Sequence, residues 1–138
     1  MEIKKILVPI DGSDASERAF REACFLAEKT DAEITMLYVM DPETLIPAYK
    51  ELPEHPEDPF IKKGEAILDI YLADAPKDVK AEKKVVFGMP GNSIVSESED
   101  MDLIVMGNSG KGSISSFVMG SVSHYVVHHS ECPVLIVK

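Results

Sequence analysis

Five short apolar runs punctuate the chain, and each is almost free of polar residues. They are Ile6 to Ile10, Ile34 to Val39, Val85 to Phe87, Leu103 to Met106 and Val134 to Val137. A strand with one solvated face alternates apolar and polar residues, whereas unbroken runs such as LIVM and VLIV are typical of a sheet that is covered on both faces. The runs therefore predict five strands of a parallel sheet.

The segments between these runs have helical spacing. The first predicted helix begins near Ser13 or Asp14, with Asp14 and Glu17 as a pair that resembles a capping box. Its apolar stripe comprises Ala19, Phe20, Ala23, Leu26 and Ala27. The second begins at Asp58-Pro59, a typical N-cap and first-turn proline, and its stripe comprises Phe60, Ile67, Leu68, Tyr71 and Leu72.

The last predicted helix runs from about Ser116 to Ser130 and buries Val118, Val122, Tyr125 and Val126. Between Met89 and Met101 only Ile94 and Val95 could seed a helix, so a brief one is expected there. Strands that alternate with helices imply right-handed crossovers and a doubly wound three-layer α/β sandwich. The length of 138 residues fits one such domain over residues 1–138.

The formal net charge of −10 argues against nucleic acid or an anionic membrane surface as a partner. No apolar stretch approaches the roughly 18 residues of a membrane span. The first apolar run is too short for a secretory signal, which favours a cytoplasmic protein. Cys24 and Cys132 have neither CxxC nor zinc spacing, so both are expected to be reduced and mostly buried.

A proline-rich, acidic segment from Asp41 to Pro59 follows the second predicted strand. It is expected to be an irregular, solvated loop at the carboxyl end of the sheet, where open α/β sheets bind ligands. Two interpretations stay open: a lid over a ligand, or a surface connection with no ligand contact.

Glycines cluster after the fourth predicted strand, at Gly107, Gly110, Gly112 and Gly120. Backbone N–H groups in such a loop, together with a helix N-terminus, can hold phosphate without basic side chains. A Walker A box would need a lysine before Ser113, and a dinucleotide-binding GxGxxG would follow the first strand, so both motifs are excluded. A GxSxG nucleophile elbow fails as well, because Gly110 comes one place too early.

The spacing that matches is Gly107-x2-Gly110-x9-Gly120-Ser121, and here the chain resembles the universal stress protein family. The segments ILVPIDGS, LYVMD, DLIVMG and GSVSHYVVHHSECPVLIVK are similar to family segments and stand in family order. The resemblance implies an adenine nucleotide alpha hydrolase-like fold with strand order 3-2-1-4-5. In one respect the chain departs from the family: the connection from Gly88 to Asp102 is shorter than usual, which leaves the helix count on one face open.

The resemblance also implies a nucleotide site. Pro9, Ile10 and Asp11 would border adenosine, Val39 would contact adenine, Met106 and Gly107 would approach the ribose, and Gly110, Gly120, Ser121 and Val122 would line the phosphates. Lys111, the sole basic residue of the cradle, either pairs with a terminal phosphate or is solvated. The ligand would be ATP, or ADP or AMP, with Mg²⁺ or Mn²⁺ held through its phosphates.

Structural alternatives stand beside three of these roles. Asp11 could instead cap the first helix ahead of Ser13, Ser121 could bond back within its own helix, and Gly120 could serve close helix packing. His124 and His128 have metal-ligand spacing, although no third ligand accompanies them.

The expected function is an ATP-binding regulatory stress protein with at most slow ATP hydrolysis, because the cradle contains no arginine. The resemblance implies a homodimer through the last strand, Val134, Leu135, Ile136 and Val137, which is an apolar sheet edge under the implied order. The alternative is a protein-interaction module on the same fold that binds no nucleotide.

Overall fold

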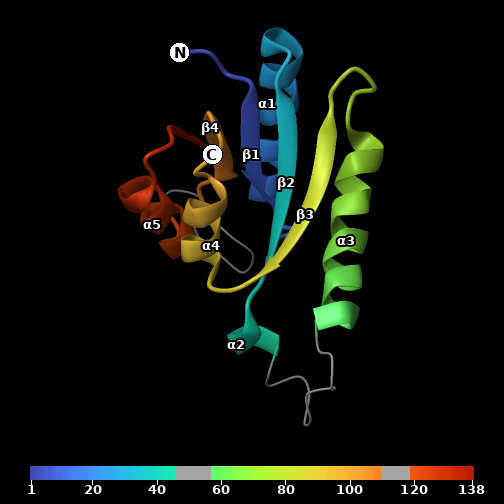
Figure 1. Ribbon diagram of the computed structural model, residues 1–138, viewed down its shortest axis with the longest axis vertical. Coiled ribbons are helices and arrows are strands. Elements are labelled where there is room, and N and C mark those ends of the chain that lie inside the picture. The colour runs from blue at the N-terminus through green and yellow to red at the C-terminus, as the bar shows by residue number, and fades with distance from the viewer. Residues whose placement is uncertain (46–56, 110–118) are drawn as a thin grey trace.

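The computed structural model describes residues 1–45, 57–109 and 119–138 (Figure 1). Its strands are β1 (Lys5–Pro9), β2 (Glu33–Met40), β3 (Ala81–Phe87), β4 (Leu103–Gly107) and β5 (Val134–Val137). Its helices are α1 (Asp14–Thr30), α2 (Pro42–Leu45), α3 (Glu57–Asp74), α4 (Pro90–Glu97) and α5 (Ser121–His129).

All paired strands are parallel, and their order is β3-β2-β1-β4-β5, which confirms the expected fold. The register aligns Lys5 with Glu33 and Pro9 with Leu37, so β1 and β2 begin together and β2 continues beyond the end of β1, to Met40. On its other side β1 aligns Ile6 with Leu103 of β4. The sequence predicted each strand, with ends that differ by a few residues; the largest extension is in β3, which begins at Ala81.

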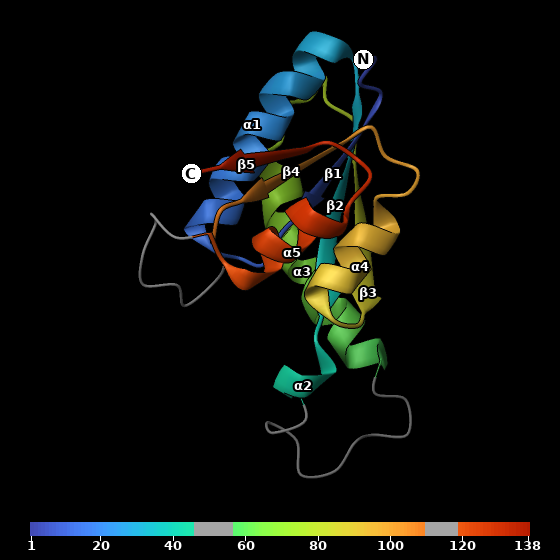
Figure 2. The same ribbon diagram turned by 90° about the vertical axis from the view of Figure 1, so that its left-hand side faces the viewer.

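Successive side chains of β1 enter two separate cores. Ile6 and Val8 pack with α1 and α3, while Leu7 packs with Ile94 of α4 and Val126 of α5. Ile6, Leu7 and Val8 are each fully buried. Figure 2 shows α4 and α5 in front of the strands, on the face opposite α3. The unbroken apolar runs thus reflect a sheet covered on both faces, as predicted.

The N-terminus of α1 differs from the predicted capping pair. Ser13 is the N-cap, and its hydroxyl accepts a hydrogen bond from the Ser16 amide at 3.2 Å. The Ser16 hydroxyl in turn donates to the Ser13 carbonyl at 3.0 Å. The prediction that Asp14 and Glu17 form the capping box is therefore wrong, because the helix begins one residue earlier than that pairing requires.

Two other predictions of local structure need correction. The last helix begins at Ser121 with Gly120 as N-cap, rather than near Ser116; residues 110–118, including Val118, lie outside the described structure. The Asp41 to Pro59 segment is not irregular at its two ends, where Pro42–Leu45 forms α2 and Glu57 begins α3. The brief helix between Met89 and Met101 is confirmed as α4.

The two cysteines are not joined by a disulfide. Cys24 is buried in α1, and burial, with a smaller effect of nearby Glu28, raises the pKa of its thiol to about 11. Cys132 is half-buried and packs against the α4–α5 side of the core. Within the three described ranges, no helix combines the length and apolar character needed to cross a bilayer.

Asp102 links the starts of β1 and β4. Its Oδ2 accepts hydrogen bonds from the Lys4 and Lys5 amides, both at 2.9 Å, and its own amide donates to the Lys5 carbonyl at 2.9 Å. These backbone donors hold the pKa of the Asp102 carboxyl below its ordinary value.

A carboxyl whose pKa is lowered by folding stabilises the protein above its unfolded pKa of about 3.9, and that contribution is lost as the pH falls through the folded pKa. Asp102→Asn should therefore lower the free energy of unfolding at pH 7. At pH 2.5 the difference in free energy of unfolding between the variant and the wild type should be smaller. Urea denaturation at both pH values measures this. The exposed neighbour variant Asp100→Asn is the control, and an equal deficit for Asp102→Asn at both pH values would contradict the assignment.

Candidate functional site

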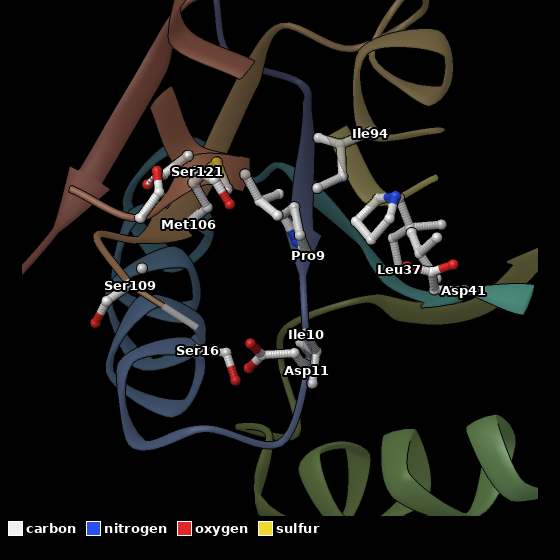
Figure 3. Close-up of a pocket in the computed structure, with 16 residues that line it drawn as sticks. Pro9, Ile10, Asp11, Ser16, Leu37, Asp41, Ile94, Met106, Ser109 and Ser121 are labelled. Atoms are coloured by element: carbon white, nitrogen blue, oxygen red, sulfur yellow. Dashed lines mark hydrogen bonds between the residues drawn. The ribbon is translucent and has the colours of Figure 1, made fainter. Parts of the chain in front are cut away.

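A cavity of about 580 Å³ opens at the carboxyl ends of β1, β2 and β4, beside the N-termini of α4 and α5 (Figure 3). Here the chain turns from β1 toward one face of the sheet, while the connection after β4 leads to helix α5 on the other. Ligands of open α/β sheets bind at such a switch point. The cavity volume lies within the range of small-molecule sites.

All predicted site residues that the structure describes line this cavity. They are Pro9, Ile10, Asp11, Val39, Met106, Gly107, Gly120, Ser121 and Val122. The other two, Gly110 and Lys111, lie outside the described residues. The fold therefore brings together segments that are more than a hundred residues apart in the sequence.

Several further residues, which the sequence patterns did not indicate, also line the cavity. They are Ser16, Leu37, Asp41, Pro90, Ile94, Ser109 and Ser123. Two signals were available: Asp41 directly follows a predicted strand, and Ser109 lies inside the glycine motif. The sequence predicts Ile94 only as part of a brief helix, and no sequence signal showed that α4 would begin beside the cavity.

The cavity is polar at its sides and apolar between them. Figure 3 places Ser109 and Ser121 on one side and Leu37 and Asp41 on the other, with Asp11 at a third corner. Among the described lining residues there is no lysine, arginine or histidine, and the two acidic ones are Asp11 and Asp41. The two carboxylates are thus separated in space from the uncharged polar side chains of Ser109 and Ser121.

Asp11 organises the turn from β1 into α1. Its Oδ1 accepts a hydrogen bond from the Ser13 amide at 2.9 Å, and the intervening Gly12 has φ +84°, a backbone conformation that favours glycine. Asp11 therefore does not cap the helix, since Ser13 does; it holds the turn that precedes the cap. Burial is the main cause of the raised pKa of Tyr38, and the negative charge of Asp11 is the second cause.

The N-terminus of α5 faces the cavity without an acidic residue in its first turn. Gly120 is its N-cap and supplies no side-chain hydrogen bond. The Gly120 carbonyl accepts from the His124 amide at 2.9 Å, so the amides of Ser121, Val122 and Ser123 precede the first intrahelical bond. Together with the helix dipole, these amides form a site for an anion.

The start of α5 is fixed to the end of β4 through Asn108. The Asn108 carbonyl accepts from the Gly120 amide at 2.6 Å and from the Ser123 hydroxyl at 2.9 Å. Ser123 also lies 3.0 Å from the Gly120 carbonyl, so it is Ser123 that bonds back within the helix. Ser121 lines the cavity, and its hydroxyl makes no hydrogen bond to another group in the described part of the chain.

The histidines of α5 do not complete a metal site with their described neighbours. The rings of His124 and His128 lie 4.4 Å apart between centroids, and the His129 ring stacks on Tyr125. Across residues 1–45, 57–109 and 119–138, no group of three or more His, Cys, Asp or Glu side chains could hold a metal ion. The pair at metal-ligand spacing therefore lacks a third described protein ligand.

A model of the universal stress protein family matches residues 2–138. Universal stress protein MJ0531 of Methanocaldococcus jannaschii is 35% identical over 98% of this chain and 82% of its own length. The chain belongs to the universal stress protein family.

Two solved structures reinforce the fold. The structure of protein MJ0577, solved to assign its biochemical function, has a TM-score of 0.87 at 27% identity and covers 100% of this chain and 97% of its own. A universal stress protein in complex with cAMP has a TM-score of 0.69 at 26% identity, covering 100% and 98%. Both likenesses extend over the whole chain.

Gly107 is required by packing at the cavity wall. A Cβ at this position would lie 2.7 Å from the Ala15 Cβ and 2.9 Å from the Ala15 carbonyl carbon. Gly107→Ala should lower the free energy of unfolding by about 1–3 kcal/mol, the usual cost of overpacking. Chemical denaturation measures the loss.

Ala15→Gly supplies the matched test of this contact. In the double variant it should restore only part of the lost stability, because the Ala15 backbone remains close to the added methyl group. Complete additivity of the two substitutions would show that Gly107 and Ala15 do not constrain each other.

Proposed function

We propose that the cavity binds an adenine nucleotide, with ATP as the principal ligand and ADP or AMP as shorter forms. The observation that carries the proposal is the separation of polar groups across the cavity. Carboxylates of Asp11 and Asp41 lie away from Ser121 and the N-terminus of α5, with apolar side chains between them. An adenine nucleotide is arranged to match: its adenosine part has hydrogen-bond donors and a flat ring, and its phosphate end is an anion.

The adenosine part would occupy the acidic and apolar region. Carboxylates accept hydrogen bonds from an exocyclic amine or from ribose hydroxyls, and they repel phosphate. Leu37, Val39 and Ile94 supply apolar surface for the flat base. Pro9, Ile10 and Met106 would complete the wall around the base and sugar.

The phosphates would lie at the N-terminus of α5, where Gly120, Ser121 and Val122 line the cavity and backbone amides supply the hydrogen bonds. From the sequence, Gly110 and Lys111 would complete this cradle. A bound Mg²⁺ or Mn²⁺ would be held mainly by the phosphates, since the described part of the chain offers no cluster of protein ligands. The relative solved with cAMP supports an adenine nucleotide as the ligand class.

Hydrolysis would be slow at most. Fast phosphoryl transfer uses a dedicated lysine or arginine and a group that positions water. None of the described lining residues is basic, and the only basic residue of the predicted cradle is Lys111. The bound nucleotide would instead act as a regulatory ligand in a stress response, by stabilising one conformation or association state of a cytoplasmic protein.

Ser121→Asp should weaken ATP binding at least tenfold, which corresponds to about 1.4 kcal/mol, because it places a carboxylate beside the proposed phosphates. Adenosine affinity should change by less than twofold, since adenosine carries no phosphate. Isothermal titration calorimetry with ATP, AMP and adenosine measures both values.

Ser96→Asp is the matched control, because Ser96 is exposed on α4 and does not line the cavity. It adds the same charge and should leave ATP affinity unchanged. If the wild-type protein bound no adenine nucleotide at millimolar concentration, nucleotide binding would be rejected and the alternative, a protein-interaction module on this fold, would be favoured.

The same proposal includes a homodimer formed through β5. This strand is at the edge of the sheet. The carbonyls of Pro133 and Val137 accept hydrogen bonds at 2.9 and 3.0 Å from the amides of Ile104 in β4 and of Asn108 directly after β4. Because backbone polar groups alternate in direction along a strand, those of Val134 and Ile136 point to the open edge. An apolar edge of this kind can pair with a second copy, with Leu135 exposed beside it.

Ile136→Pro removes one outward amide and should convert the dimer to a monomer, while Ile136→Val should remain dimeric. Static light scattering gives the mass, and circular dichroism checks that the variant is folded. A folded Ile136→Pro protein with unchanged dimer mass would show that β5 does not form the interface.

A further inference from the structure

A second hollow, of about 830 Å³, lies between α1 and α3, on the face of the sheet opposite α4 and α5. We call it the α1–α3 groove. Its lining residues are Asp11, Gly12, Glu17, Phe20, Arg21, Cys24, Phe25, Glu28, Ile67, Ile70, Tyr71, Asp74 and Pro76. All of them lie in the described part of the chain, and apart from Asp11 none belongs to the candidate nucleotide site.

The floor of the groove is well packed: Phe20 and Tyr71 are both buried. The rings of Phe20 and Tyr71 meet edge to face at 5.5 Å, and the Tyr71 hydroxyl lies 3.3 Å from the buried Ser16 hydroxyl. These contacts tie α1 to α3 at one end of the groove. A floor that is already packed offers a partner a preformed surface, with little loss of conformational entropy on binding.

The walls expose large apolar side chains. Phe25 on α1 is 55% exposed and Ile70 on α3 is 66% exposed, and both line the groove. The Phe25 ring already attracts a cation, because the Lys29 ammonium lies 5.5 Å from its centroid. Exposed apolar side chains beside a hollow are typical of an interaction surface.

The charge around this apolar surface is predominantly negative. Four lining residues are acidic: Asp11, Glu17, Glu28 and Asp74. One, Arg21, is basic. Arg21 is already engaged by Glu17 at 2.5 Å. Helix α3 also has no basic residue in its last turn, so its negative dipole end adds to the charge of Asp74.

From these features we infer that the α1–α3 groove binds an amphipathic helix of a partner protein, with leucine-like side chains in the groove and lysine or arginine along its edges. A groove between two helices accommodates a third helix through side-chain interdigitation. The wall from Glu17 to Glu28 spans roughly 16 Å at 1.5 Å per residue, which matches about three helical turns of the partner.

The acidic rim of the groove argues against the same face of a second copy as the occupant. If the same face of a second copy packed there, Glu28 and Asp74 of the two rims would lie against like charges, whereas a basic helix is attracted. An acyl chain would use the apolar floor but gain nothing from Glu28 or Asp74. The acidic rim therefore selects a basic, helical partner.

The experiment uses the nucleotide-free full chain, so its result does not depend on nucleotide binding. The probe is a fluorescein-labelled 14-residue helical peptide with leucines on one face and lysines beside them. Fluorescence anisotropy should give saturable binding that weakens with salt. Phe25→Glu and Ile70→Glu should each raise Kd at least tenfold, while Leu72→Glu, on an exposed α3 residue outside the groove, should leave Kd within twofold.

Charge variants provide a second, independent readout. Glu28→Gln with Asp74→Asn should raise Kd several-fold and reduce its dependence on salt, because two anionic contacts are lost. Amide chemical-shift changes in the labelled protein should map to α1 and α3. The inference is overturned if a peptide with glutamates in place of the lysines binds equally well, if Leu72→Glu weakens binding as much as Ile70→Glu, or if only a fatty acid probe occupies the groove.

Discussion

The central position of β1 is the constraint on which the rest of this structure depends. Ile6, Leu7 and Val8 are fully buried because β2 and β4 flank the strand and helices cover both of its faces. The same position creates the switch point at which the cavity opens, since the segments after β1 and β4 lead to helices on opposite faces. Burial of one strand therefore determines both the core and the place where a ligand can enter.

The described part of the proposed anion site offers backbone amides rather than basic side chains. A net charge of −10 disfavours phosphate binding, yet the segment from Gly107 to Ser121 has no acidic residue. Asn108 accepts hydrogen bonds that hold the start of α5 against the end of β4. The acidic residues act elsewhere: Asp102 joins two strands, and Glu28 and Asp74 edge the α1–α3 groove.

Much of the fold followed from apolar patterning, because a doubly covered parallel strand needs an almost unbroken run of apolar residues. The helix starts were less predictable. Ser13, Asp14 and Glu17 all suit a first turn, and only the backbone geometry selects Ser13 as the cap. Likewise, the apolar stripe of the last helix gave no indication that Gly120 would precede its first turn.

The sequence by itself determined the strands, the helices that cross between them and the glycine spacing that indicates the family, because these depend on local periodicity and short motifs. The tertiary structure alone decided which distant residues lie next to one another. Asp41 and Ile94 line the same cavity, and Phe25 and Ile70 line the same groove. The physical reason is that local patterns determine which face of an element is buried. The neighbours of the remaining surface depend on how all the elements pack.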